Sequence, residues 1–182
     1  MQGENVLNKT IESKRLIYRP ITEEDTDMVL KWRNSDMVKS NFIYREFITR
    51  EDHLSWLENK VKPGKVIQFI MVEKSNGRPI GSVYLRDIDS SAKKAEYGIF
   101  IGEADAHGKG YGSEAAVRMK ELFFNEMKYH KLSLRVLERN AAAIKSYEQA
   151  GYRVEGRLVD EIYADGRYET IIFMAILEDD IN

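Results

Sequence analysis

The sequence predicts a single α/β domain in which helices flank a mixed, mostly antiparallel central sheet. Three observations lead to this prediction. Short apolar or alternating segments typical of strands recur along the chain, two tight-turn dipeptides separate neighbouring strands, and a glycine-rich segment precedes a helical stretch. The 182 residues suit one domain, and the three prolines form no linker. We expect about seven strands and four helices within residues 13–178, preceded by a tail over residues 1–12.

The first elements are a strand and two helices. Residues 15–19 alternate between polar and apolar side chains and predict a strand. Thr22 precedes Asp25 by three positions, and Thr49 precedes Asp52 in the same way. This spacing is typical of a capping box, which satisfies free amides where a helix begins. Each pair therefore predicts the start of a helix.

Three strands follow. Residues 66–73 and 80–85 are apolar segments on either side of Asn76-Gly77, a pair that tolerates the positive φ angles of a hairpin turn. Residues 95–101 form the third segment. Antiparallel neighbours are expected here.

The second half alternates helices and strands. The predicted helices cover residues 113–127 and 140–150, and the second of them ends at Gly151. The predicted strands cover residues 132–137, 152–163 and 168–177, the last two joined through Asp165-Gly166. Because the helix at 113–127 connects two strands, one strand pair should be parallel.

Composition excludes several classes of protein. The chain has no cysteine, which excludes a disulfide scaffold, a thiol nucleophile and thiolate metal ligands. No metal site is expected, since His53, His107 and His130 are scattered. A net charge of -2 does not favour nucleic acid as a partner. No segment has the apolar length of a membrane span and the N-terminus lacks a signal-peptide core, so we expect a cytoplasmic protein without membrane contact.

The loop from His107 to Gly112 is the first motif that carries chemistry. Its glycines at 108, 110 and 112 lie between a strand and a helix. Amides at a helix start have no partners within the helix, so glycines there let the backbone approach a phosphate closely. The spacing matches neither a P-loop nor a dinucleotide-binding loop. Taken alone, it fits an anion cradle and a plain turn about equally.

Asn140 and Tyr147 form the second motif. Asn140 occupies the position of a helix N-cap, and Tyr147 lies two turns later on nearly the same face. Without further context, they could be a cap and a core aromatic residue.

Together the two motifs resemble those of the GNAT superfamily of N-acetyltransferases, over about residues 15–177. The segments 155–158 and 165–168 are similar to the branch that acetylates ribosomal-protein alanine or spermidine. The front half resembles enzymes that acetylate the amino group of nucleotide-linked amino sugars. That likeness lies in residues 32–34, 53–56 and 95–98.

The resemblance implies acetyl-CoA as co-substrate, with its pyrophosphate on the loop amides. His107 departs from the Gln or Arg usual in the family, so only its backbone role carries over. The implied coenzyme contacts are Phe100, Ile101, Gly102, His107, Gly108, Lys109, Gly110, Tyr111, Gly112, Ser113 and Asn140. Tyr147 is implied as the general acid that protonates the leaving thiolate.

Glu96 is the predicted general base, because it lies on the strand before the glycine loop. A paired surface carboxylate is the alternative. Some relatives carry a catalytic Glu at the position of Arg135, so a general base at that position is not available in this chain.

The predicted acceptor pocket combines aromatic faces with fork-like donors. It comprises Trp32, Arg33, Asn34, His53 and Trp56. Core packing and helix termination are the alternatives for these residues. The acceptor itself stays open between a nucleotide-linked amino sugar, a protein N-terminus and a polyamine. A non-catalytic acetyl-CoA-binding module and a homodimer also stay open.

Overall fold

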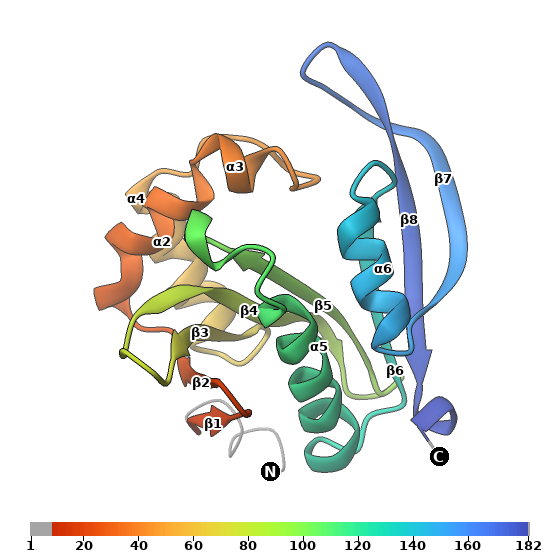
Figure 1. Cartoon of the computed structure of the whole chain (residues 1–182), viewed down its shortest axis with the longest axis horizontal. Coiled ribbons are helices and arrows are strands. Elements are labelled where there is room, and N and C mark those ends of the chain that lie inside the picture. The colour runs from red at the N-terminus through yellow and green to blue at the C-terminus, as the bar shows by residue number, and fades with distance from the viewer. Residues whose placement is uncertain (1–8, 182) are drawn as a thin grey trace.

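The computed structural model describes residues 9–181, which form one eight-stranded sheet with helices on both faces (Figure 1). The strand order is β1-β2-β3-β4-β5-β6-β8-β7. The strands are β1 (Ile11–Glu12), β2 (Leu16–Pro20), β3 (Ile67–Glu73), β4 (Pro79–Asp89), β5 (Lys94–Ile101), β6 (Lys131–Leu137), β7 (Arg153–Ala164) and β8 (Arg167–Leu177). The helices are α2 (Thr26–Arg33), α3 (Asp36–Lys39), α4 (Arg50–Trp56), α5 (Tyr111–Glu121) and α6 (Ala141–Gln149).

The predicted fold class is confirmed, with two short elements added. The strand β1 occupies positions assigned to the N-terminal tail, whose residues 1–8 lie outside the described part. The helix α3 is a single turn in which the Ser35 side chain accepts from the amide of Val38. Elements of two and four residues are too short to produce a periodic pattern.

The local signals for turns and helix starts are largely confirmed. Asp25 accepts from the amide of Thr22 and Asp52 from the amide of Thr49, each at 2.9 Å. Asp165 and Gly166 both have positive φ, as a tight hairpin requires. The turn at Asn76-Gly77 differs, because residues 74–78 make a longer connection in which Gly77 alone of this pair has positive φ.

The helix predicted over 113–127 begins earlier and changes its winding. Gly110 takes a left-handed conformation, with φ of 79°, and serves as the N-cap of α5. After Glu121 the chain continues as a π-helical turn over Leu122–Glu126. The early start places the last glycine of the loop inside the first helical turn.

The sheet opens between β5 and β6, its one parallel pair. Register partners run from Lys94 and Lys131 to Glu96 and Ser133 and then end. Both strands continue beyond that point, β5 to Ile101 and β6 to Leu137. The two strand edges therefore separate, and their backbone groups no longer pair with each other across the opening.

The two faces of the sheet carry different helices (Figure 1). Side chains of α5 and α6 pack into the larger core, together with β-strand residues such as Val83, Leu85 and Tyr97. Side chains of α2 and α3 pack into a smaller core around Ile70 and Phe100. Because the sheet separates these two groups of helices, the opening between β5 and β6 connects the two sides of the molecule.

Candidate active site

A cavity of about 460 Å³ occupies the opening between β5 and β6. On one side it is lined by the glycine loop and the first turns of α5 and α6. On the other side it is lined by α3 and by residues 40–49, the segment between α3 and α4, which we call the strap. The cavity thus runs through the sheet from the α5/α6 face to the α2/α4 face.

The glycine loop has the backbone of an anion cradle. Gly108 and Gly110 have φ of 72° and 79°, which only glycine adopts readily. Gly112 has an ordinary φ, and a Cβ there would have nothing within 4 Å. It lines the cavity at the start of α5, where amides lack helical partners. Packing therefore does not explain Gly112, and its predicted role in a close approach of the coenzyme stays a prediction.

Arg15 braces this loop, and no local sequence pattern marks it. Its Nη1 donates to the carbonyl of Lys109 at 2.8 Å, and its Nε pairs with Glu114 at 2.6 Å. Its guanidinium lies 4.6 Å from the ring centroid of Tyr111. The Lys109 side chain is exposed and has no hydrogen bond among the described residues, so Arg15 is the cation that is fixed against the loop.

The free edge of β5 presents Ile99 and Ile101. The amide of Gly102 donates to Ile80 on β4, and Phe100 pairs with Ser82. Backbone groups alternate along a strand, so those of Ile99 and Ile101 face the opening.

Two of the three predicted strand contacts are therefore placed differently. Phe100 lines the cavity only with its side chain, and a Cβ on Gly102 would come within 2.2 Å of Trp32. Ile99, which was not among the predicted contacts, presents its backbone to the opening instead, because hydrogen bonding to β4 decides which residues face the free edge. The ring nitrogen Nε2 of His107 contacts the carbonyl of Ile101 at 3.1 Å.

Asn140 and Tyr147 both line the cavity from α6. The Asn140 oxygen caps the helix by accepting from the amide of Ala143 at 3.2 Å. Tyr147 packs edge-to-face on Tyr97, with ring centroids 6.2 Å apart. Burial raises the pKa of Tyr147 above its ordinary value, with a further contribution from Tyr84. The phenol therefore stays protonated throughout the neutral range.

Ser113 joins the two helices that border the cavity. Its hydroxyl lies 2.7 Å from that of Ser146, so α5 and α6 contact each other beside the glycine loop. The hydroxyl is thus engaged within the chain.

Glu96 reaches the cavity between two arginines. Arg86 Nε donates to Oε1 at 3.1 Å, and Arg135 Nε donates to Oε2 at 3.0 Å. Both carboxylate oxygens already accept hydrogen bonds from guanidinium groups. This is the arrangement expected if Glu96 is a paired carboxylate, the alternative to a general base. Its role as general base stays a prediction.

A second cavity of about 300 Å³ adjoins the first on the α2/α4 face. It shares Phe42, Tyr44, Tyr84, Arg86 and Phe100 with the first cavity. The predicted acceptor residues Arg33, His53 and Trp56 line it.

Trp32 and Asn34 lie outside both cavities. Trp32 is 2% exposed and donates to Glu103 at 2.8 Å, so it is a core residue. The Asn34 side chain binds both backbone groups of Ile48, at 2.8 and 2.9 Å, and so anchors the strap. Core packing therefore explains Trp32, and helix termination explains Asn34, which is the C-cap of α2. Both were the alternatives to a role in acceptor binding.

Arg33 is a cation in the second cavity without an ion pair among the described residues. Its guanidinium lies 3.4 Å from the ring centroid of Phe42 and 5.9 Å from that of Phe100. Burial lowers its pKa, and the titratable neighbours that act on it are Tyr84 and Arg86, without a carboxylate among them. His53 lies in the same cavity lining, 6% exposed, and its Nε2 has no partner within the described residues. Buried polar groups without partners are costly, so this cavity has the character of a ligand site.

We expect Gly110→Val to weaken coenzyme binding by roughly tenfold or more, about 1.4 kcal/mol. A branched side chain disfavours the left-handed backbone, by about 1–2 kcal/mol, and so reshapes the loop amides. Titration calorimetry with acetyl-CoA measures the change.

Gly77→Val is the matched control, because Gly77 has φ of 71° in a distant turn with nothing within 4 Å of a Cβ. Both variants should lose thermal stability, and only Gly110→Val should lose affinity. An unchanged dissociation constant for Gly110→Val would remove the cradle assignment.

Within residues 9–181, no group of three or more His, Asp or Glu side chains is arranged to hold a metal ion. No helix of the described chain is long and apolar enough to cross a membrane.

Comparison with known proteins adds to this geometry. The family profile described as "Acetyltransferase (GNAT) domain" matches residues 15–153. Spermidine N(1)-acetyltransferase of Vibrio cholerae serotype O1 is 28% identical over 166 residues, covering 91% of this chain and 95% of the relative. The uncharacterized protein MJ1062 of Methanocaldococcus jannaschii is 30% identical over 165 residues, covering 87% of this chain. The match spans 33% of that longer relative.

A solved structure has the same fold. The crystal structure of spermidine N-acetyltransferase from Vibrio cholerae in complex with CoA and spermine superposes with a TM-score of 0.86 at 24% identity. The match covers 93% of this chain and 100% of that one. At this identity the likeness establishes the fold.

Proposed function

Because the chain belongs to the GNAT family of N-acetyltransferases, we propose that it acetylates a primary amine carried by an anionic molecule, such as a nucleotide-linked amino sugar. The observation that carries the proposal is Arg33, a half-buried cation in the second cavity that forms no ion pair with a described residue. The sequence resemblance of the front half to amino-sugar-nucleotide enzymes supports the same acceptor class.

The residues around the first cavity fit a coenzyme with a pyrophosphate and an extended amide-bearing arm. The loop amides and the start of α5 suit the pyrophosphate. The free edge at Ile99 and Ile101 suits the arm, which would pair with it as an added strand. Asn140 caps α6 through its oxygen, and its Nδ2 group is the donor assigned to the same arm.

The reaction joins the amine nitrogen to the acetyl carbon and breaks the carbon–sulfur bond, so that the amine loses a proton and the sulfur gains one. Acetyl-CoA supplies the activated acetyl thioester. Tyr147 holds a proton on its hydroxyl at the cavity wall and is assigned to donate it to the sulfur. A backbone N–H on the free edge of β5 is assigned to stabilise negative charge on the acetyl oxygen.

The acceptor is assigned to the α2/α4 side because the two cavities meet there. Among the charged groups of this region, Arg86 and Arg135 both bind Glu96, and Arg33 has no ion pair with a described residue. Asp52 also lines the second cavity, where its carboxylate accepts from the backbone and hydroxyl of Thr49. Guanidinium groups bind phosphate and carboxylate well through their fork of donors. A polycation such as a polyamine would meet like charge here.

A polyamine is the second candidate acceptor. This candidate is supported by the similarity to the Vibrio cholerae spermidine N(1)-acetyltransferase, which aligns with 91% of this chain. The two candidates carry opposite charge, so one experiment separates them.

The test is an acetylation screen with the purified protein and acetyl-CoA. Nucleotide-linked amino sugars, spermidine and a peptide with a free N-terminus are offered one at a time, and thiol release and product mass are measured. Acetylation of the amino-sugar nucleotide supports the proposal. Acetylation of spermidine alone would replace it with the second candidate.

A further inference from the structure

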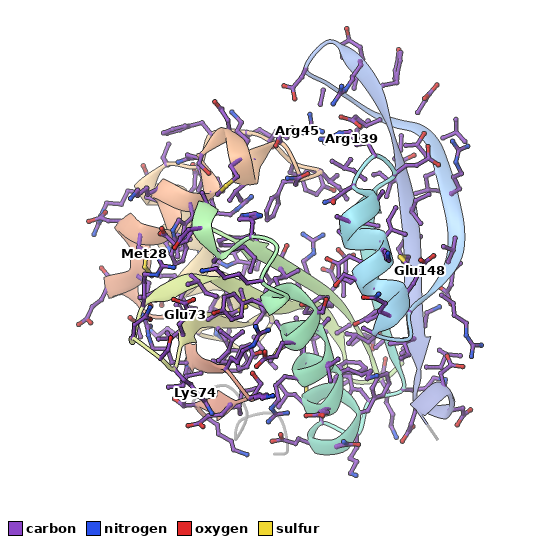
Figure 2. The ribbon with its side chains drawn as sticks, viewed as in Figure 1. Met28, Arg45, Glu73, Lys74, Arg139 and Glu148 are labelled. Carbon is purple, nitrogen blue, oxygen red and sulfur yellow. The ribbon has the colours of Figure 1, made fainter. Side chains whose placement is uncertain are left out.

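Glu169 on β8 is a buried carboxylate outside both cavities. It is 5% exposed, and the side chains of three arginines converge on it. Arg45 Nη2 and Arg139 Nε donate to its Oε1 at 2.9 Å, and Arg167 Nε does so at 3.2 Å. Figure 2 places Arg45 and Arg139 close together between the strap and the C-terminal hairpin. The cluster therefore ties together segments that are 30 and 124 residues apart in sequence.

The hydrogen bonds outweigh burial in setting the charge of this group. Burial by itself would raise the pKa of Glu169. The hydrogen bonds that Arg45 and Arg139 donate to the carboxylate together have the larger effect and lower the pKa to about 2. Glu169 is thus an ionised carboxylate at neutral pH, where its ion pairs with the three arginines are fully charged.

Arg45 connects Glu169 to the wall of the second cavity, and it also pairs with the exposed carboxylate of Asp165. The Arg45 side chain is 8% exposed, and its Nε donates to the carbonyl of Phe42 at 3.0 Å. Phe42 in turn lies over the Arg33 guanidinium and edge-on to Phe100 at 5.9 Å. Arg139 adds a second tie, because its Nη2 donates to the carbonyl of Ser40 at the start of the strap.

We propose that Glu169 is a positioning residue for the acceptor, which fixes Arg45 and through it the strap residue Phe42 over Arg33. The proposal rests on the proposed function in placing the acceptor between the strap and α4. It assigns Glu169 no contact with either substrate.

The test compares Glu169→Gln with Glu138→Gln. Glu138 is the matched control, because it is bound by Arg157 through two guanidinium hydrogen bonds on the same half of the sheet and does not touch the strap. Glu169→Gln should raise the acceptor KM about three- to tenfold, which corresponds to part of the free energy of a charge-assisted hydrogen bond. The acetyl-CoA KM should stay unchanged. Glu169→Gln should also speed amide hydrogen exchange in residues 41–48. Glu138→Gln should change none of the three.

Arg45→Lys provides a second variant in case Glu169→Gln folds poorly. A lysine keeps the charge but cannot bind Glu169 and the Phe42 carbonyl at once, so it should reproduce the exchange and KM effects in milder form. Equal rises in both KM values, or unchanged exchange in the strap, would overturn the proposal.

The exchange readout needs no acceptor. It therefore separates failure of the strap tie from failure of the proposed acceptor class, which the acetylation screen decides. If another amine proves to be the substrate, its KM serves in the same comparison.

Discussion

Replacing Tyr147 by phenylalanine is expected to lower kcat by about two to three orders of magnitude, the usual value of a positioned proton donor. The acetyl-CoA KM should change little, because the aromatic ring and its packing on Tyr97 are retained. Burial raises the pKa of this phenol, so no ionisation of Tyr147 should appear in the neutral pH range of the wild-type profile. Steady-state kinetics with varied acetyl-CoA measure both quantities.

Tyr152→Phe is the control for this experiment. The Tyr152 hydroxyl is buried without a partner within the described residues, and its ring packs 5.9 Å from that of Tyr147. Its loss removes the same atom from the same cluster and should leave kcat nearly unchanged. If Tyr147→Phe also turned over at the wild-type rate, Tyr147 would have no part in proton transfer.

Replacing Arg33 by leucine is expected to make the protein more stable and less active. This half-buried cation forms no ion pair with a described residue, so its removal should raise the melting temperature. The same change should lower kcat/KM for an anionic acceptor about a hundredfold, roughly 2.7 kcal/mol. Opposite effects on stability and activity are typical of residues retained for binding.

Lys31→Leu is the matched control for Arg33. Lys31 is an exposed cation on the same helix, and its removal should affect neither kcat/KM nor the cavity. Thermal unfolding and kinetics on the two variants complete the comparison. Unchanged kcat/KM in Arg33→Leu would exclude Arg33 from acceptor binding.

The parts of the fold that sequence predicted well have local causes. The capping pairs at Thr22 and Thr49 act over three residues, and the hairpin at Asp165-Gly166 depends on two. The glycine loop and Asn140 are local motifs as well, and the structure brings both to one cavity.

The parts that sequence missed depend on contacts between distant segments. Arg15 reaches Lys109 across 94 positions, and Arg45 reaches Glu169 across 124. No periodicity or spacing marks such pairs. Trp32 and Arg33 are neighbours with the same local pattern, yet one is core and the other lines the cavity, because only the packing of α2 on the sheet decides which side each faces.

The opening between β5 and β6 would allow the two proposed substrates to meet. A fully paired sheet would separate the α5/α6 face from the α2/α4 face, but pairing ends at Glu96 and Ser133. Beyond this point the proposed coenzyme groove and the proposed acceptor cavity share residues of β4, β5 and the strap.

The most direct test of the account is a competition in one vessel. Wild-type protein receives acetyl-CoA with equal concentrations of a nucleotide-linked amino sugar and spermidine, and mass spectrometry follows both products over time. The acetylated amino-sugar nucleotide should accumulate first, and Arg33→Leu should reduce this preference. Preferential acetylation of spermidine by the wild-type protein would contradict it.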